Sequence, residues 1–334
     1  MVLVSYAIRG TMHRDTLQWV AALDLMLELQ PELLVPQHTR PLSGEEKIRE
    51  TITAYRDAIQ FVHDQTVRLM NKGLSGRQTA EMVRLPAHLA SHPYLTEYYG
   101  TVEWSVRAVF NGYIGWFSGH PSDLHPLPVT EETELMLELA GGRQNMLDQL
   151  RLAVSRGNFQ WALKLSDYLV DTETSDQEEV VELRSKCLQT LAYREVSAPG
   201  MNWYLTEDLV MRGLQIKPSQ AARAQRIKSG DIKALFLMLT CMLDDQKTRD
   251  VVMTSVFKFT DTGSLVVVTI RRGVCVLSYT APPSVDMEVV TAEKVFREIL
   301  AKERNALSAN LTGELSVSTG ITEFARFFGY FDTD

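Results

Sequence analysis

The sequence predicts a multidomain protein that is mainly α-helical and ends in a smaller α+β domain. The chain has 334 residues, more than the ~100–200 residues of a typical domain. Apolar residues recur every three or four positions over most of the stretch before residue 213, as in helices that bury one face. After Pro218 the chain contains runs rich in Val, Thr, Phe and Tyr, which are typical of strands.

The N-terminal part predicts a fragment of an α/β layer. Apolar and polar residues alternate loosely over residues 2–8, which predicts a strand. Apolar residues at helical spacing predict a helix over 14–29, with Leu17, Val20, Ala21, Leu25 and Leu29 on its face. A short buried strand is predicted over 33–35, with His38 just beyond it. Because α/β folds place chemistry at the C-terminal ends of strands, His38 is the strongest single candidate for a metal ligand.

Helices are predicted from there to residue 213. One over 44–73 begins with Ser43 and Glu46 as a predicted capping box. Its predicted buried face holds Ile48, Ile52, Tyr55, Ile59, Val62, Thr66 and Leu69. Others are predicted over 76–83 and 98–117. Four antiparallel helices within 130–213 predict packing like that of tetratricopeptide repeats, although no strict repeat consensus is present.

The C-terminal part predicts a separate domain with an antiparallel sheet and helices at its sides. Strands are predicted in "VVMTSVFKFTD", "SLVVVTIRR", "VCVLSYT" and "GELSVSTG". Helices are predicted in "QAARAQRIKSGDIKALFLMLTCML", in "TAEKVFREILAKE" with Thr291 as its N-cap, and in "ITEFARFFGYF".

The composition excludes several classes of function. A net charge of −8 gives no electrostatic basis for binding nucleic acid. No apolar run approaches the ~20 residues of a membrane helix, and "MVLVSYAIRG" lacks the features of a signal peptide, so we expect a cytoplasmic protein without a membrane span. Cys187, Cys241 and Cys275 form no CxxC pair and are predicted to be buried thiols.

The segment "YIGWFSGHPSDLHPLP", residues 113–128, follows an apolar helix with two histidines and three prolines. It fits a metal site, a substrate loop, or a rigid turn that places the next segment. His88 and His92 have the i, i+4 spacing of a zinc pair, but flanking prolines and the lack of a nearby Cys, Asp or Glu favour a surface loop.

Four segments, in this order, resemble the linear primary alkyl sulfatases: "LVPQHTRPLSG", "VHDQTVRLMNKG", "YYGTVEWSVRAVFNGYIGWFSGHPSDLHPLP" and "NWYLTEDLVMRG". These sulfuric ester hydrolases have a metallo-β-lactamase fold, use two zinc ions and cleave dodecyl sulfate and similar esters. The resemblance implies three parts. Residues 1–42 would be the C-terminal tail of the catalytic α/β domain, 43–213 a helical dimerisation domain, and 214–334 a domain like sterol carrier protein 2.

The resemblance also implies roles for single residues. His38 matches the family's last metal-ligand histidine, in an H-x-x-P context, and Arg9 and Arg14 match a segment near the sulfate pocket. Trp116 and Phe117 would form the apolar wall for an alkyl chain. Trp104 stands where the bacterial enzymes carry a histidine.

The family's main zinc motif, H-x-H-x-D-H, would lie upstream of Met1, and no such cluster occurs in this sequence. Because one histidine cannot hold two zinc ions, we expect the chain to be inactive alone. A gene model or isoform lacking its 5′ portion and a genuine non-catalytic remnant both fit. We expect a homodimer through the helical domain that binds an alkyl sulfate or another lipid-like ligand. The alternative is a non-catalytic dimerisation and lipid-binding protein with a tunnel in residues 215–334.

Overall fold

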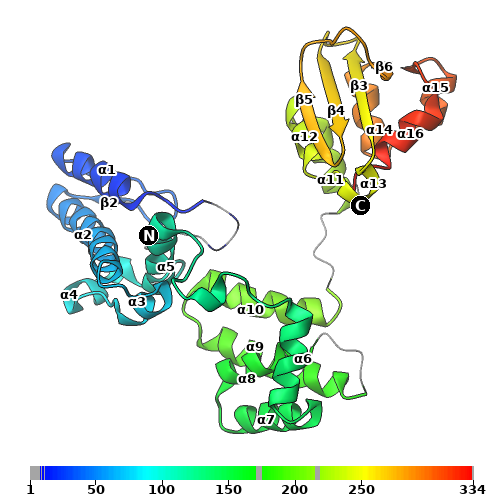
Figure 1. Cartoon of the computed structure of the whole chain (residues 1–334). Coiled ribbons are helices and arrows are strands. Elements are labelled where there is room, and N and C mark those ends of the chain that lie inside the picture. Colours follow the sequence, from blue (N-terminus) through cyan, green and yellow to red (C-terminus); the bar gives the residue numbers. More distant parts are fainter. Residues whose placement is uncertain (1–7, 9, 11, 171–174, 215–218, 333–334) are drawn as a thin grey trace. The chain divides into compact units, whose positions relative to one another are not determined.

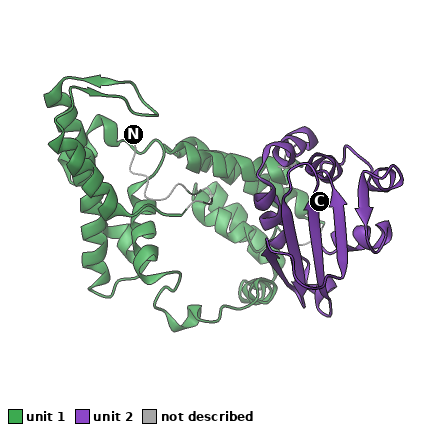
Figure 2. Ribbon diagram, turned by 90° about the horizontal axis from the view of Figure 1, so that it is seen from above, with its two compact units in different colours: residues 1–215 green, residues 216–334 purple. Residues whose placement is uncertain are grey.

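The computed structural model describes residues 8, 10, 12–170, 175–214 and 219–332 and divides the chain into two compact units, residues 1–215 and 216–334 (Figures 1 and 2). The first unit is almost entirely helical and the second contains a small sheet, so the predicted mainly helical architecture is confirmed. The strand predicted over 2–8 lies almost wholly outside the described residues. Among the helices described, none is long and apolar enough to cross a membrane.

The first unit begins with a helix and a hairpin that lead into a long helix. The elements are α1 (Thr16–Glu28), β1 (Leu33–Leu34), β2 (Leu42–Ser43) and α2 (Glu45–Met70). α1 packs along α2, and all seven apolar-face positions predicted for α2 are buried. The predicted capping box is wrong, because Ser43 belongs to β2 and pairs with Leu33. α2 instead follows Gly44, whose φ of 97° suits a residue without a Cβ.

Two predictions about burial at this end are wrong. α1 buries Val20 and Leu23 against α2, whereas Leu17, Leu25 and Leu29 are exposed. The predicted buried strand is one arm of a two-stranded antiparallel hairpin, and its Leu33 is 60% exposed. The packing explains both results. α1 packs along α2 and buries one narrow stripe of side chains, and the hairpin contacts α2 with Leu42 buried, which leaves Leu33 exposed.

A second group of helices packs on α2. Its elements are α3 (Gly76–Met82), α4 (Ala87–Ala90), η1 (Pro93–Leu95) and α5 (Val102–Ile114). Ser75 and Gln78 form a reciprocal capping box at the start of α3. α5 contacts both α2 and α3 and buries Val102, Val106, Val109 and Phe110. It ends at Gly115, with a φ of 84°, so the predicted extension to residue 117 is wrong.

The rest of the first unit is a run of helices with sequential neighbours packed together. It comprises η2 (Pro121–Asp123), α6 (Val129–Leu139), α7 (Arg143–Ser155), α8 (Phe159–Ser166), α9 (Gln177–Arg194) and α10 (Ala198–Met211). α7 packs on α8, α8 on α9 and α9 on α10 (Figure 1). The predicted turn at Gly157 and Asn158 separates α7 from α8. The likeness to tetratricopeptide packing stays a prediction.

A buried arginine ties this bundle together. Arg184 on α9 is 8% exposed. Its guanidinium donates to Ser166 Oγ (2.7 Å) and pairs with Asp167 Oδ1 (2.7 Å) near the end of α8 and with Glu207 Oε1 (2.9 Å) on α10. Charge-assisted hydrogen bonds of this kind are about twice as strong as neutral ones, so this side chain fixes three helices at one point.

The second unit is a mixed five-stranded sheet with helices packed on it (Figure 1). The strands are β3 (Val252–Phe259), β4 (Leu265–Arg271), β5 (Val274–Ser278), β6 (Met287–Thr291) and β7 (Leu315–Val317), in the order β5-β4-β3-β6-β7. The helices are α11 (Gln220–Ser229), α12 (Ile232–Thr240), α13 (Asp245–Thr248), α14 (Glu293–Leu300), α15 (Ala306–Leu311) and α16 (Ile321–Phe328).

Two details of the predicted sheet are wrong. β3 and β6 pair in parallel, with Phe257 opposite Val289, so the sheet is mixed and not antiparallel. Thr291 is the last residue of β6 and not an N-cap; Ala292 precedes α14 instead. The segment "MEVVT" forms β6 and pairs with β3 on one side and with β7 on the other. Its five residues alone do not predict this position in the sheet.

Phenylalanine rings fill the interior between this sheet and its helices. Phe236 on α12 and Phe296 on α14 stack with their centroids 5.5 Å apart, and Phe257 on β3 lies 5.0 Å from Phe236. Phe327 on α16 lies 5.6 Å from Phe257. All four rings are buried. Such close aromatic packing makes this a solid core.

Replacing Arg184 with alanine should destabilise the first unit by about 3 kcal/mol. The partner carboxylates of Asp167 and Glu207 are partly exposed and can rehydrate, which places the loss at the low end of the range for a broken buried pair. The measurement is urea unfolding followed by tryptophan fluorescence, because all five tryptophans lie in residues 1–215. Arg77→Ala, which breaks an exposed pair with Glu81, should leave the midpoint unchanged. Equal midpoints for the two variants would contradict this role.

Candidate functional site

A cavity of about 850 Å³ lies in the first unit, beside α5. It is bounded by the segment before α1, the start of α3, one side of α5 and the segment 115–123. The lining residues are Ile8, Met12, His13, Ser75, Gly76, Arg77, Trp104, Arg107, Ala108, Phe110, Asn111, Gly115, Trp116, Phe117, Ser118, His120 and Asp123. Its volume falls in the usual range of small-molecule sites.

α5 sets the position of most of these side chains. Thr101 Oγ1 accepts from the Trp104 amide (3.1 Å) and Glu97 Oε1 accepts from the Val102 amide (2.5 Å), so the first turn of the helix is capped. Trp104, Arg107, Ala108 and Asn111 then recur at helical spacing along the cavity. The opposite side of the same helix is buried in the core.

The segment after α5 forms an apolar wall of the cavity. Gly115 turns the chain, and the rings of Trp116 and Phe117 follow in edge contact, 5.8 Å apart. Trp116 is 73% exposed. Ser118 Oγ donates to Asp123 Oδ2 (2.5 Å) and accepts from the His120 amide (3.1 Å), which closes the segment into a short loop. The structure therefore brings Trp116 and Phe117 together at one cavity, and their role in binding remains a prediction.

Basic side chains accompany this apolar wall. Arg107 is held by Glu103 on the preceding turn, with nitrogen–oxygen distances of 2.7 and 3.1 Å, and Arg77 lies at the start of α3. His13 lies so close to α5 that a Cβ on Gly112 would be 2.7 Å from its Nε2 atom. An apolar wall beside arginine and histidine groups suits a ligand that has both a hydrocarbon part and an anionic part.

Two other predicted site residues, His38 and Arg14, do not line this cavity. His38 is exposed in the loop of the β1–β2 hairpin. The Arg14 guanidinium lies 5.6 Å from the centroid of the Trp19 ring, and Arg9 lies outside the described residues. Over the ranges that the structure describes, no group of three or more His, Cys, Asp and Glu could hold a metal ion. The donors therefore do not fit the two zinc ions that the sequence resemblance implies.

Buried polar side chains occur away from this cavity. His63 on α2 is buried and bonds to Asp64 and to Tyr113 on α5. Cys187 is buried, and burial raises the pKa of its thiol and that of half-buried Cys275 to about 11. The prediction of three buried thiols is wrong for Cys241, which is exposed near the end of α12.

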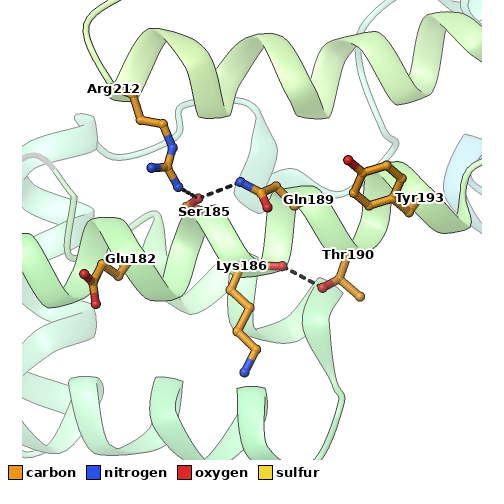
Figure 3. Close-up of a pocket in the computed structure, with 7 residues that line it drawn as sticks. All are labelled: Glu182, Ser185, Lys186, Gln189, Thr190, Tyr193 and Arg212. Carbon is orange, nitrogen blue, oxygen red and sulfur yellow. Dashed lines mark hydrogen bonds between the residues drawn. The ribbon is translucent and has the colours of Figure 1, made fainter.

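A second hollow, of about 370 Å³, was not predicted from the sequence (Figure 3). It lies on α9 and the end of α10. Its lining residues are Glu182, Ser185, Lys186, Gln189, Thr190, Tyr193 and Arg212. Ser185 accepts hydrogen bonds from Arg212 and Gln189, and Arg212 also pairs with buried Asp208 at 3.0 Å. Because these groups satisfy one another, we place the candidate site at the larger cavity.

Comparison with known proteins gives two family matches and several relatives. Residues 75–213 match the family model described as alkyl sulfatase dimerisation, and residues 220–334 match alkyl sulfatase C-terminal. The chain is similar to a linear primary-alkylsulfatase of Pseudomonas sp. (strain ATCC 19151), with 35% identity over 98% of this chain. It is also similar to an (R)-specific secondary-alkylsulfatase of Pseudomonas sp., with 27% identity over 97% of this chain.

The fold agrees with these matches. The solved structure of the stereoselective inverting sec-alkylsulfatase Pisa1 from Pseudomonas sp. superimposes with a TM-score of 0.87 and 28% identity over 97% of this chain. In each case the chain spans only part of the relative: 64% of the primary enzyme, 50% of the secondary enzyme and 52% of the solved chain.

Proposed function

We propose, from the premise that this chain belongs to the alkyl sulfatase family, that its first unit binds primary alkyl sulfates in the cavity beside α5. The observation that carries this proposal is the combination of one apolar wall, made by Trp116 and Phe117, with Arg77 and Arg107 in the same cavity. The hydrocarbon chain would gain free energy on leaving water. The sulfate group would be met by guanidinium groups, which donate two parallel hydrogen bonds to such oxyanions.

In this proposal the chain contributes substrate binding and assembly, and not the zinc chemistry of ester hydrolysis. The family resemblance implies that two zinc ions activate water and stabilise the developing charge on sulfate. Within the described parts of the chain no suitable group of ligands is present, and exposed His38 would be a single donor. We therefore derive no hydrolytic step from these residues.

We also propose that the chain forms a homodimer through α6, which lies within the residues matched by the dimerisation family model. All residues of α6 are described, and none of them is buried. Its apolar side chains face solvent: Leu135 is 48% exposed, Leu139 is 80% exposed and Val129 is 76% exposed. A helix that buries so little in its own unit gains stability only when another surface covers it. A second copy of the chain is the partner that fits the family match.

The alternative, a lipid tunnel in residues 215–334, is less well supported. Packed phenylalanine rings occupy the interior between the sheet and its helices, with centroid separations of 5.0 to 5.6 Å among Phe236, Phe257, Phe296 and Phe327. A long-chain ligand would have to displace them. The cavity beside α5 requires no such rearrangement, so we assign the alkyl ligand to the first unit.

Trp116→Ala should weaken binding of decyl sulfate about tenfold, because removal of the indole takes away a large part of the apolar wall. Isothermal titration below the micelle concentration measures this. The matched control is Trp161→Ala, since Trp161 is also an exposed tryptophan but does not line the cavity. Equal losses in both variants, or no saturable binding by the unmodified chain, would contradict the proposal.

The purified chain, incubated with zinc and dialysed, should retain less than one zinc ion per chain and should release no sulfate from dodecyl sulfate. The reason is the absence of converging ligands among the described residues. Elemental analysis gives the metal content and ion chromatography the sulfate. Stoichiometric zinc together with turnover would refute this, and loss of both in His38→Ala would identify the ligand that supports them.

Leu139→Glu should convert the dimer to monomer, since it places a charge within the proposed apolar contact. Sedimentation velocity over a range of concentrations measures the change. Leu311→Glu is the control, because Leu311 on α15 is as exposed (79%) but lies in the second unit. A monomeric unmodified chain, or an equal response of both variants, would rule out α6 as the interface.

A further inference from the structure

A hydrogen-bonded chain of three side chains links α2 to α5 and ends on an exposed phenol. Asp64 Oδ1 lies 2.8 Å from His63 Nδ1, and His63 Nε2 lies 2.8 Å from the Tyr113 hydroxyl. His63 is 7% exposed, whereas Tyr113 is 58% exposed. The order is therefore a carboxylate, a buried imidazole and the hydroxyl of an exposed tyrosine, and neither the alkyl-sulfate proposal nor the family matches assign this chain of groups a role.

The hydrogen bonds determine which imidazole nitrogen carries the proton. An ionised carboxylate only accepts hydrogen bonds, so Nδ1 of His63 is the protonated nitrogen and donates to Asp64. Nε2 then holds a lone pair and accepts the Tyr113 hydroxyl proton. Gln60 donates to the other Asp64 oxygen at 3.2 Å, which holds the carboxylate in place. This is the arrangement by which a carboxylate–histidine pair activates a hydroxyl group.

We propose that Tyr113 is a nucleophilic acceptor site for acyl groups from activated esters, with His63 as the base and Asp64 as a positioning residue. A phenol is easier to deprotonate than the serine hydroxyl that similar triads activate. Tyr113 is more than half exposed as a residue, and the base beside its hydroxyl is buried.

The step balances without a further reactant. As the Tyr113 oxygen attacks the carbonyl carbon of the ester, His63 Nε2 takes the phenol proton. The bond from that carbon to the leaving alkoxide or phenoxide breaks, and the proton on Nε2 passes to the leaving group or to water. The products are the tyrosyl ester and the released alcohol or phenol, and no oxidation or reduction occurs.

Other exposed tyrosines of the same chain provide an internal comparison. Tyr98 and Tyr193 are 63% and 78% exposed, more than Tyr113. If the His63 contact only held α5 to α2, the three phenols would react in the order of their exposure, with Tyr113 the slowest. General-base assistance contributes about 10²–10⁴-fold to such reactions. The proposal therefore predicts that Tyr113 reacts faster than Tyr98 and Tyr193.

The test is acetylation of the intact chain by p-nitrophenyl acetate at neutral pH, quantified at each tyrosine by peptide mass spectrometry over time. We expect Tyr113 to be acetylated at least about 10²-fold faster than Tyr193. Tyr113→Phe should abolish that product without changing acetylation of Tyr98 and Tyr193. Acetylation of Tyr193 at an equal or greater rate than Tyr113 would overturn the proposal.

Two variants separate the relay from simple structural support. His63→Gln removes the base and should reduce Tyr113 acetylation to the rate of Tyr193. Asp64→Asn changes a side chain that is 49% exposed; its amide can donate to Nδ1 and thereby shift the imidazole proton to Nε2, which can then no longer accept from the phenol. It should slow Tyr113 acetylation while circular dichroism and thermal midpoint stay unchanged. A folded Asp64→Asn chain with undiminished Tyr113 reactivity would overturn the role of Asp64.

Discussion

The packing of α5 against α2 and α3 is the constraint on which the rest of the first unit depends. Burial of Val102, Val106, Val109 and Phe110 on one side of α5, each worth about 1.5–3 kcal/mol when complete, fixes the rotation of the helix. That rotation directs Trp104, Arg107 and Asn111 to the cavity and places Tyr113 beside His63. Gly115 then ends the helix, so the aromatic pair that follows lies at the same cavity.

The helices from α7 to α10 form a bundle in which sequential neighbours pack together. Arg184 joins α8, α9 and α10 through charge-assisted hydrogen bonds. Because these bonds are directional and apolar contacts are not, they define how the three helices are arranged at this point. α6 is the contrasting element, because it leaves Leu135 and Leu139 open to solvent. Uncovered apolar side chains on α6 agree with the family match to a dimerisation region.

The chain belongs to the alkyl sulfatase family and covers part of the length of its relatives. It aligns with the C-terminal part of its primary-alkylsulfatase relative and spans 64% of it. The described residues line an amphipathic cavity beside α5 and include no group of three or more His, Cys, Asp and Glu that could hold a metal ion. The Asp64–His63–Tyr113 chain needs neither a metal nor the cavity.

The sequence alone determined the helical character of the chain, the core face of α2 and the family, since periodic apolar residues and contiguous motifs are local properties. It also pointed to Trp116 and Phe117 through one proline-rich segment. Only the tertiary structure decided which side of α1 is buried, that Thr291 ends a strand and that β6 runs parallel to β3. It likewise brought His63 to Tyr113, fifty residues further along the chain, because contacts between distant segments depend on how whole elements pack.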